Sequence, residues 1–422
     1  MRDRPGILAE GEGQMGGVGR IGGKRVVVAG GGPAGMMAGA LFARAGVDTL
    51  VLEKHEDFLR DFRGDTVHPS TLSLMREMGW IDEFLSRPHQ KVRELSVNLA
   101  GREWRVADMS RLPVPDNFVA MMPQWDFLDF IADKAQAFPH FRLRMNAEVV
   151  DTILSADGRV VGVRLHDGEE VPADLVIVAD GRRSILREKA GLPLRELGAP
   201  IDVAWFRLSK RNDGENRTGG VFAPGRLLVR IDRGDYWQAA FVLPKGTFEQ
   251  VRSRGIDAFR TDIVRLSPEL AAVAQELQDW EQVKLLSVAL DRLTRWHRPG
   301  LLAIGDAAHA MSPVGGVGIN LAVQDAVAAA NILAAALARG DDVDRHLARV
   351  QARRLLPTRI IQRLQKVAHD RIIGAVLRAE DAFETAPMPL RLLDRYGTLR
   401  LLPAWLIGLG VRREHIRSPA AE

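Results

Sequence analysis

The sequence predicts an α/β fold with a Rossmann-like core. Three short segments predict it: VVVAGGGPAG followed by TLVLE within residues 26–53, DLVIVADGRRSILR at 174–187, and IGDAAHAMSPVGGVGIN at 304–320. In each segment a short apolar run, typical of a buried strand, leads into a glycine-containing turn. The three segments stand in an order and at intervals that allow one folded domain to gather them.

The first segment has the pattern of a dinucleotide-binding turn. Val26–Ala29 is an apolar β-branched run, which suits a strand covered on both faces. The glycines that follow allow a tight turn, the approach of a pyrophosphate to the backbone, and close packing of the helix expected at Pro33–Arg44. The residues expected to bind the dinucleotide here are Gly30, Gly32, Pro33, Ala34 and Gly35.

A carboxylate stands where such a turn requires one. A second apolar run, Thr49–Leu52, ends at Glu53, about 20 residues past the turn, where it can accept hydrogen bonds from an adenosine ribose. We include the adjacent Lys54 in the expected site. The alternative is a glycine-rich connection without a ligand, but the strand, the helix and Glu53 together favour dinucleotide binding.

The second segment distinguishes between dinucleotides. Asp180 and Gly181 follow an apolar run, and the segment resembles the DGxxSxxR motif of class A flavoprotein hydroxylases, the para-hydroxybenzoate hydroxylase family. The resemblance implies that Asp180 and Gly181 lie beside the FAD pyrophosphate and the route of the nicotinamide cofactor. The arginines at 182, 183 and 187 favour a phosphate-facing role, because guanidinium groups match phosphate geometry. A plain strand end with a turn is the alternative.

The third segment resembles the second FAD fingerprint of that family, GDAAHxxxPxxGxGxN. The resemblance implies that the aspartate binds the ribityl chain and that the Pro/Gly loop lies against the isoalloxazine ring. Bare N–H groups at the start of the following helix could stabilise the negative charge of reduced flavin. We expect His309 to be a buried structural residue, and no catalytic residue is assigned. The implied FAD contacts are Asp306, Pro313, Gly316, Val317, Gly318 and Asn320.

Three further positions complete the expected cofactor site. Arg63 lies ten residues after Glu53, where related hydroxylases place an arginine near the flavin or the pyrophosphate. Gln124 heads a helix-like stretch and resembles the family glutamine that touches FAD. Val149 is included with them. An ordinary surface role is the alternative for Arg63 and Gln124.

Composition fits a large enzyme without metal or disulfide chemistry. The chain has 422 residues, 46% of them hydrophobic, and no cysteine. The missing cysteines exclude FAD-dependent disulfide reductases and a cysteinyl-flavin link, and they fit a cytoplasmic protein. The net charge of +4 is dispersed and no basic run is interleaved with aromatics, so nucleic acid is not an expected partner. A metal site and stable membrane insertion are not expected either.

The expected organisation is an FAD-binding Rossmann-like domain of the GR2 type, an inserted β-sheet substrate domain and C-terminal helices. Residues 1–23 are glycine-rich and expected to form a disordered leader. The FAD-binding domain is assigned to residues 24–70, 119–187 and 291–355. The substrate domain is assigned to 71–118 and 188–290, and the C-terminal helical region to 356–422. Strand-rich insertions between FAD motifs are, by the resemblance, a sheet roofing the flavin.

Two features leave alternatives open. The run LRLLPAWLIGLGV near the C-terminus is too short to span a bilayer, and is either a helix packed on the substrate pocket or an interfacial patch for a lipid-like substrate. Trp237 and Phe241 lie on an expected strand, where they either line a pocket or belong to the core. A monomer and a homodimer both remain possible.

The resemblance implies an FAD-dependent monooxygenase that uses NADPH or NADH. It would hydroxylate an aromatic, enolic or polycyclic apolar small molecule through a flavin C4a-hydroperoxide, with the protein orienting the substrate and excluding water. The alternatives are a prenyl-chain reductase, a halogenase and a redox-silent FAD-binding protein. The WxWxIP motif of halogenases is absent from the sequence.

Overall fold

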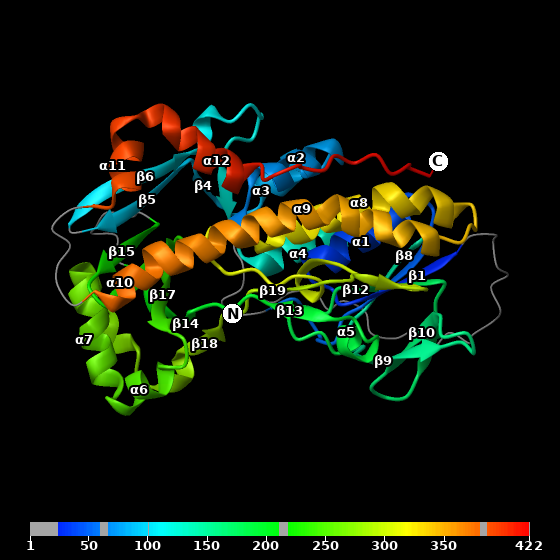
Figure 1. The fold of residues 1–422 in the computed structure, drawn as a ribbon, viewed down its shortest axis with the longest axis horizontal. Helices are drawn as coiled ribbons and strands as arrows, with labels where there is room; N and C mark the ends of the chain where they lie inside the picture. The colour runs from blue at the N-terminus through cyan, green and yellow to red at the C-terminus, as the bar shows by residue number, and fades with distance from the viewer. Residues whose placement is uncertain (1–23, 60–65, 100, 211–217, 380–385, 422) are drawn as a thin grey trace.

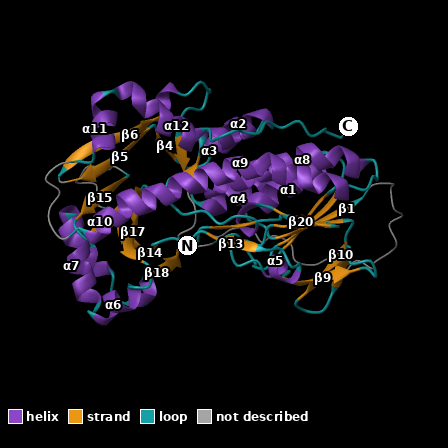
Figure 2. Cartoon of the chain, viewed as in Figure 1, coloured by secondary structure: helices purple, strands orange, loops and turns teal. Residues whose placement is uncertain are grey.

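A computed structural model describes residues 24–59, 66–99, 101–210, 218–379 and 386–421. The expected leader at 1–23 and Arg63 lie outside the described residues. Figure 1 shows an elongated molecule with strands at both ends, and Figure 2 shows the long helices that run between them.

The core of one end is a six-stranded sheet with the order β20-β21-β12-β1-β2-β8. Strand β1 lies at its centre and pairs in parallel with β2 and β12. The three apolar runs of the sequence motifs therefore become neighbouring strands whose carboxyl ends meet at one edge. The strands are His297–Arg298, Leu301–Ala303, Leu175–Val178, Arg25–Ala29, Asp48–Leu52 and Phe141–Arg144.

Three long helices cover this sheet. Helix α1, Pro33–Arg44, packs against α8, Gly318–Ala338, and against α4, Gln124–Ala135. Helix α9, Asp344–Ala368, lies on the outer side of α8 (Figure 1). A side chain at Gly39 would lie 2.5 Å from Val51 Cγ2, so this glycine is what lets α1 pack so closely on β2.

Smaller elements complete this end of the molecule. A three-stranded antiparallel sheet, β9 to β11, follows β8, and a second one joins β3, β7 and β4. Helix α5, Ile185–Lys189, follows the second motif, and strands β13 and β19 pair with each other. The strands are Val149–Leu154, Val160–Leu165, Glu170–Pro172, Thr66–Val67, Val119–Met121, Gln90–Val92, Leu194–Glu196 and Asp291–Leu293.

The other end is a seven-stranded sheet with the order β18-β14-β17-β16-β15-β5-β6. Strands β5 and β6 come from the first expected insertion and the other five from the second. The two groups join through a parallel pairing of β5 with β15. The strands are Lys284–Ser287, Ile201–Ser209, Tyr236–Pro244, Arg226–Asp232, Gly219–Ala223, Glu94–Leu99 and Arg102–Asp108.

The two faces of this sheet have different partners. One face carries Phe206, Trp237 and Phe241 and is covered by α6, Phe248–Ser253, and α7, Ile256–Leu266. Phe241 meets Phe259 of α7 with ring centroids 5.3 Å apart. Trp237 and Phe241 are therefore core residues, the second of the two alternatives.

The opposite face is turned toward the third motif. Its core residues pack with the partly buried Trp205, Phe222 and Val229 and with Val314 from the loop after His309. Strand alternation produces this division, because neighbouring side chains of a strand point to opposite faces. The sheet therefore lies directly over the loop that precedes α8.

Two expected element boundaries differ from the structure. The expected limit at 70/71 falls inside α2, Pro69–Glu77, and the core around α1 and α4 is joined by apolar side chains of α2 and of the next helix, α3, Ile81–Ser86. Its Phe84 packs edge-on against Phe127 and Phe130 of α4, with ring centroids 6.0 and 5.1 Å apart. Helix α9 runs continuously across the expected limit at 355/356, with Pro357 inside it.

The C-terminal part consists of short helices and an extended tail. A π-helical turn, His369–Ile373, leads into α10, Gly374–Arg378, and later α11, Met388–Arg395, and α12, Leu401–Gly408, follow. The tail then returns along α8 and α2 toward the end of α1 (Figure 1). Helix α8 is long and apolar enough to cross a membrane, but 78% of its most apolar window is buried inside the molecule, as in a core helix.

Candidate functional site

The first motif forms a turn that Glu53 holds directly. The Gly30 N–H donates to Leu52 O at 2.8 Å, and the Gly31 N–H donates to Glu53 Oε2 at 2.8 Å. The carboxylate at the end of β2 therefore lies against the loop that leads into α1. Helix α1 starts with Pro33 and has no side-chain cap, so its first N–H groups remain available to an anion.

Several motif glycines are required by contacts within the protein. A side chain on Gly30, which has φ +106°, would collide with Ala179 O, just before the Asp-Gly turn. A side chain on Gly35 would collide with Gly30 O, and one on Gly305 would lie 2.8 Å from Ala34 Cβ. These close approaches lock the three motifs together.

Other motif glycines border open space instead. A Cβ atom on Gly32, Gly181 or Gly318 would meet no protein atom within 4 Å. Gly32 and Gly318 stand at the uncapped starts of α1 and α8. This arrangement fits a bound dinucleotide, because backbone N–H groups face space that a side chain would fill.

The carboxyl group of Asp180 also fits a site that binds a polar ligand. Its Oδ1 atom is buried and has no hydrogen-bond partner among the described residues, while Oδ2 accepts the Leu186 N–H at 3.4 Å. Burial raises the pKa of Asp180, against hydrogen bonds from Ser184 and Leu186 and the charge of Arg187. An orphaned buried oxygen beside Gly181 fits a site completed by the polar part of a cofactor.

Arg187 connects the second motif to the third. Its guanidinium donates to Arg182 O at 2.8 Å and to Ala307 O at 3.5 Å, and lies 3.8 Å from Asp291 Oδ1. Burial raises the pKa of Asp291. Arg187 is thus turned toward the protein, whereas Arg182 is half-buried and Arg183 exposed, and neither has an ion pair within the described residues.

The Asn320 side chain is occupied by the protein itself. Its Oδ1 accepts the His68 N–H at 2.9 Å and the Thr71 hydroxyl at 2.7 Å, and its Nδ2 donates to Thr66 O and Gly316 O. The Thr66 hydroxyl also donates to Gly316 O at 2.7 Å. Asn320 therefore holds the loop before α8 against the segment before α2, and any cofactor contact falls to its backbone.

His68 anchors the same segment to α12. Its Nδ1 donates to Ile407 O at 2.6 Å, and the ring is buried. Burial lowers the pKa of His68 to about 4, although the hydrogen bond to Ile407 opposes this shift. The ring is therefore neutral at physiological pH.

This lowered pKa predicts a pH-dependent stability. As pH falls from 6.5 toward about 4, His68 takes up a proton only when the chain unfolds, so folding stability is lost across that window. At about 1.4 kcal/mol per pKa unit, the loss attributable to His68 is about 3 kcal/mol. Urea unfolding at pH 7 and pH 4.5 should therefore show a smaller pH dependence for His68→Gln than for the wild type.

The control is His166→Gln, because His166 is exposed at the turn after β10. Its unfolding should keep the wild-type pH dependence. His297 and His369, whose pKa values burial also lowers, are common to all three proteins, so they do not affect the comparison. Equal pH dependence in wild type and His68→Gln would contradict the prediction.

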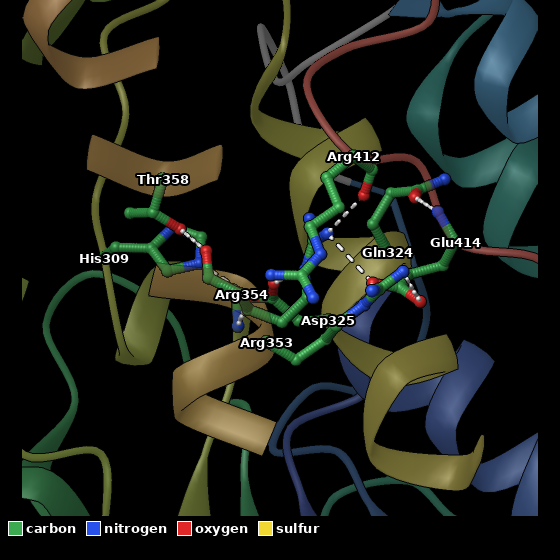
Figure 3. Close-up of polar contacts among 9 residues, drawn as sticks. His309, Gln324, Asp325, Arg353, Arg354, Thr358, Arg412 and Glu414 are labelled. Atoms are coloured by element: carbon green, nitrogen blue, oxygen red, sulfur yellow. Dashed lines mark hydrogen bonds and ion pairs between the residues drawn. The ribbon is translucent and has the colours of Figure 1, made fainter. Parts of the chain in front are cut away.

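A buried ionic network supports the third motif from behind (Figure 3). Asp325 of α8 is fully buried, and its Oδ2 accepts the Gly305 N–H at 3.1 Å and binds His309 Nε2 at 2.6 Å. Its Oδ1 accepts Arg354 Nε of α9 at 2.9 Å. Burial alone would raise the pKa of Asp325, but the charges and hydrogen bonds of His309 and Arg354 lower it.

The network continues into the C-terminal tail. Arg354 Nη1 lies 3.4 Å from both Glu414 Oε1 and Arg412 O, and Arg353 Nε donates to Glu414 Oε1 at 2.6 Å. The Glu414 N–H donates to Gln324 Oε1. The tail is thus tied through α9 and α8 to Gly305, and His309 has the buried, hydrogen-bonded position expected of a structural histidine.

Three sequence-predicted residues lie apart from these contacts. Gln124 is the first residue of α4, Val149 is half-buried at the start of β9, and Lys54 is exposed after Glu53. No hydrogen bond within the described residues links them to the glycine turns. Their cofactor contacts remain predictions. Asp306 is half-buried in the turn that Gly305 opens, and Pro313 lies in the loop before α8.

A cavity borders the cofactor loop on the side of the C-terminal helices. It is small, partly open to solvent and has room for about one water molecule, and it lies between the start of α8, α9 and α12. The side chains that line it are mainly apolar and include Val317, Leu321, Ile361, Leu406 and Ile407. The C-terminal apolar run contributes Leu406, Ile407 and Leu409 to this lining, and both alternatives for the run remain predictions.

Sequence reasoning missed the residues that position this site. Asp325 gave a usable signal, because it is the only charged residue in the apolar helix α8 and must have a partner when buried. Arg354 and Glu414 lie in arginine-rich stretches, where one more charged residue does not stand out from its neighbours. The roles of Thr66, His68 and Thr71 arise from contacts between segments that are distant in the sequence.

The chain is similar to proteins of known activity. Residues 24–364 match the family described as "FAD binding domain". The 6-methylpretetramide 4-monooxygenase of Streptomyces rimosus is 34% identical over 347 residues, which cover 81% of this chain and 82% of that protein. The dialkyldecalin synthase of Streptomyces rugosporus is 27% identical over 322 residues, 72% of this chain and 63% of that protein.

Solved structures share the fold. PqsL of P. aeruginosa, in complex with 2-aminobenzoylacetate, has a TM-score of 0.72 at 22% identity and covers 84% of this chain and 99% of its own. A 2-methyl-3-hydroxypyridine-5-carboxylic acid oxygenase mutant has a TM-score of 0.70 at 20% identity, with coverage of 93% and 99%. At these identities the likeness concerns the fold.

Proposed function

Because the chain belongs to the FAD-binding domain family of FAD-dependent monooxygenases, we propose that it hydroxylates an apolar aromatic, enolic or polycyclic small molecule in the cytoplasm. FAD is the cofactor and NAD(P)H the reductant of this family. The observation that carries the proposal is the interlocked set of three motifs, in which the glycines that do not serve packing border open space.

We assign the cofactor contacts as follows. The start of α1, with Gly32 and the following N–H groups, would hold the pyrophosphate, and Glu53 would hold the adenosine ribose. Asp306 would accept hydrogen bonds from the ribityl chain. The uncapped start of α8 would place backbone N–H groups beside the ring system. When bound, FAD supplies the transfer of electrons from NAD(P)H to oxygen and of one oxygen atom to the substrate.

The protein's own residues would hold the substrate and keep water out. The face of the seven-stranded sheet that carries Trp205, Phe222 and Val229 packs toward Val314 of the cofactor loop. An apolar, aromatic lining at this place suits an apolar aromatic substrate and excludes water from the reaction. The substrate printed for the Streptomyces rimosus relative, 6-methylpretetramide, supports a polycyclic compound.

Asp325 contributes to the site by fixing the backbone next to Asp306. Its carboxylate holds the Gly305 N–H and the His309 ring, so the residue that follows Gly305, Asp306, starts from a fixed backbone. Its lowered pKa keeps this acceptor ionised at physiological pH. His309 is 1% exposed and faces Asp325 and Trp296 inside the core, so we assign it a structural role.

The test is an assay of purified, FAD-loaded protein with NADPH or NADH, an oxygen electrode and a panel of polycyclic phenols. We expect oxygen uptake stimulated by at least one substrate and a product that gains one oxygen atom. NAD(P)H consumption with a saturated product and no oxygen uptake would identify a reductase. A product of unchanged mass, or bound FAD with no reduction by NAD(P)H, would favour the redox-silent alternative. One relative of the chain, the dialkyldecalin synthase, is named as a synthase and not as a monooxygenase.

A further inference from the structure

The C-terminal helices carry a stripe of exposed apolar side chains. The stripe follows α11, the turn after it and α12: Met388 and Leu392 are four residues apart on α11, and Leu402 and Trp405 are three apart on α12, so each helix exposes an apolar pair on one face. Each side chain is between 42% and 67% exposed. The members of this apolar stripe are Met388, Leu392, Tyr396, Leu399, Leu402 and Trp405.

Helix α11 has no buried residue. It has only eight residues, and so short a helix is marginal in water unless its apolar face is covered. Its neighbour α12 is fixed by Ala404 and Gly408, which are buried, and by the hydrogen bond from His68 to Ile407. The segment is therefore attached by its inner side, and its outer apolar stripe lacks a cover in the described chain.

The charges beside the stripe are positive. Arg391 and Arg395 are exposed, and neither has an ion pair within the described residues. Arg395 lies 5.7 Å from the centre of the Tyr396 ring. Asp394 is the only acid of the segment, and it is neutralised by Arg102 at 2.5 Å and Arg400 at 3.7 Å.

These features fit a lipid surface better than a second copy of the chain. Tyr and Trp favour the boundary between headgroups and acyl chains, and arginines beside them attract anionic headgroups. A symmetric dimer through the same stripe would bring like charges together, which is unfavourable. We propose that the apolar stripe docks peripherally on anionic bilayers, with α11 and α12 lying in the plane of the surface.

The docked helix has the cavity on its other side. Leu406 and Ile407 of α12 line the cavity next to Val317, while Leu402 and Trp405 face outward. A compound dissolved in the bilayer would therefore meet the outer side of a helix whose inner side lies beside the cofactor loop at Val317. This extends the proposed function and rests on it: the substrate class becomes apolar compounds that partition into membranes.

Flotation with vesicles of phosphatidylcholine, with and without phosphatidylglycerol, tests the docking. Wild type should float with the phosphatidylglycerol vesicles, and binding should fall as salt is raised, because the charge attraction is screened. The pair Leu402→Glu and Trp405→Glu, and separately the pair Arg391→Glu and Arg395→Glu, should each weaken binding at least about tenfold. Leu154→Glu, on β9 and 48% exposed, is the control and should bind like wild type.

Two further readouts separate the possible outcomes. FAD reduction by NAD(P)H without vesicles should be equal in wild type and the Leu402→Glu, Trp405→Glu variant, which shows that the variant is folded. If wild type reduces FAD but does not float, the docking proposal is overturned and the proposed function stands. If light scattering shows a wild-type dimer that these substitutions dissociate, with no vesicle binding, the stripe is an interface between copies and the proposal is wrong.

Discussion

Replacing Gly32 by Val is expected to abolish FAD binding while leaving the fold intact. A Cβ atom at this position meets no protein atom within 4 Å, so the apoprotein tolerates it. The branched side chain would, however, fill the space in front of the first N–H groups of α1. The lost hydrogen bonds to a charged pyrophosphate, about 1.5–3 kcal/mol each, correspond to a loss of affinity on the order of a hundredfold or more.

Titration of the apoprotein with FAD, followed by flavin fluorescence, measures this effect. Gly219→Val is the matched control, because Gly219 lies on β15, outside the motifs, and a Cβ atom there would lie 4.0 Å from Ser96 O, an ordinary van der Waals contact. The control should bind FAD normally. Valine at a helix start costs about 1 kcal/mol relative to a better cap, so a modest loss of stability in Gly32→Val is consistent with the idea. Normal FAD affinity in folded Gly32→Val would refute the site.

Replacing Arg354 by Met should cause the largest loss of stability. Arg354 is only 1% exposed and compensates two buried carboxylates, Asp325 and Glu414. Removal of one partner from a buried ion pair leaves an uncompensated charge and typically costs about 3–5 kcal/mol. Methionine keeps much of the side-chain volume, so the loss reflects charge more than a cavity. Chemical denaturation of the apoprotein measures it.

The surface pair of Arg339 and Asp341 provides the comparison. Its side chains are 65% and 46% exposed, and Arg339→Met should cost less than about 1 kcal/mol. The double variant Arg354→Met with Asp325→Asn should be less destabilised than the sum of the two single variants, because it removes both charges of the pair. A loss in Arg354→Met no larger than that in Arg339→Met would show that the buried network is not a source of stability.

The sequence determined much of the fold because its signals are local. The Val26–Ala29 and Leu175–Val178 runs are strands, and the helix at Pro33–Arg44 has the predicted limits, since strand, glycine turn and proline occur within a few residues of one another. The cofactor fingerprints are also short local patterns, and they were sufficient to predict the family. Pro357 shows the limit of local reasoning, because α9 continues through it.

What the sequence could not reveal depends on contacts between distant segments. Asn320 was expected to bind the cofactor, and nothing in its neighbourhood indicates that its amide is saturated by Thr66, His68 and Thr71. The pairing of β5 with β15 has no local signature either, because register between strands is set by the completed sheet. The same is true of Arg354, whose partners lie on α8 and in the tail.

The join between β5 and β15 limits how this enzyme can be recombined with its relatives. The sheet above the cofactor loop is assembled from two stretches of chain, and the seam between them is a parallel pairing with Val97, Asn98 and Leu99 on one side. A chimera that exchanges only residues 201–287 would set a foreign β15 against the native β5. Altered specificity is therefore best sought by transferring residues 94–108 and 201–287 as one unit, so that the seam is inherited from a single parent.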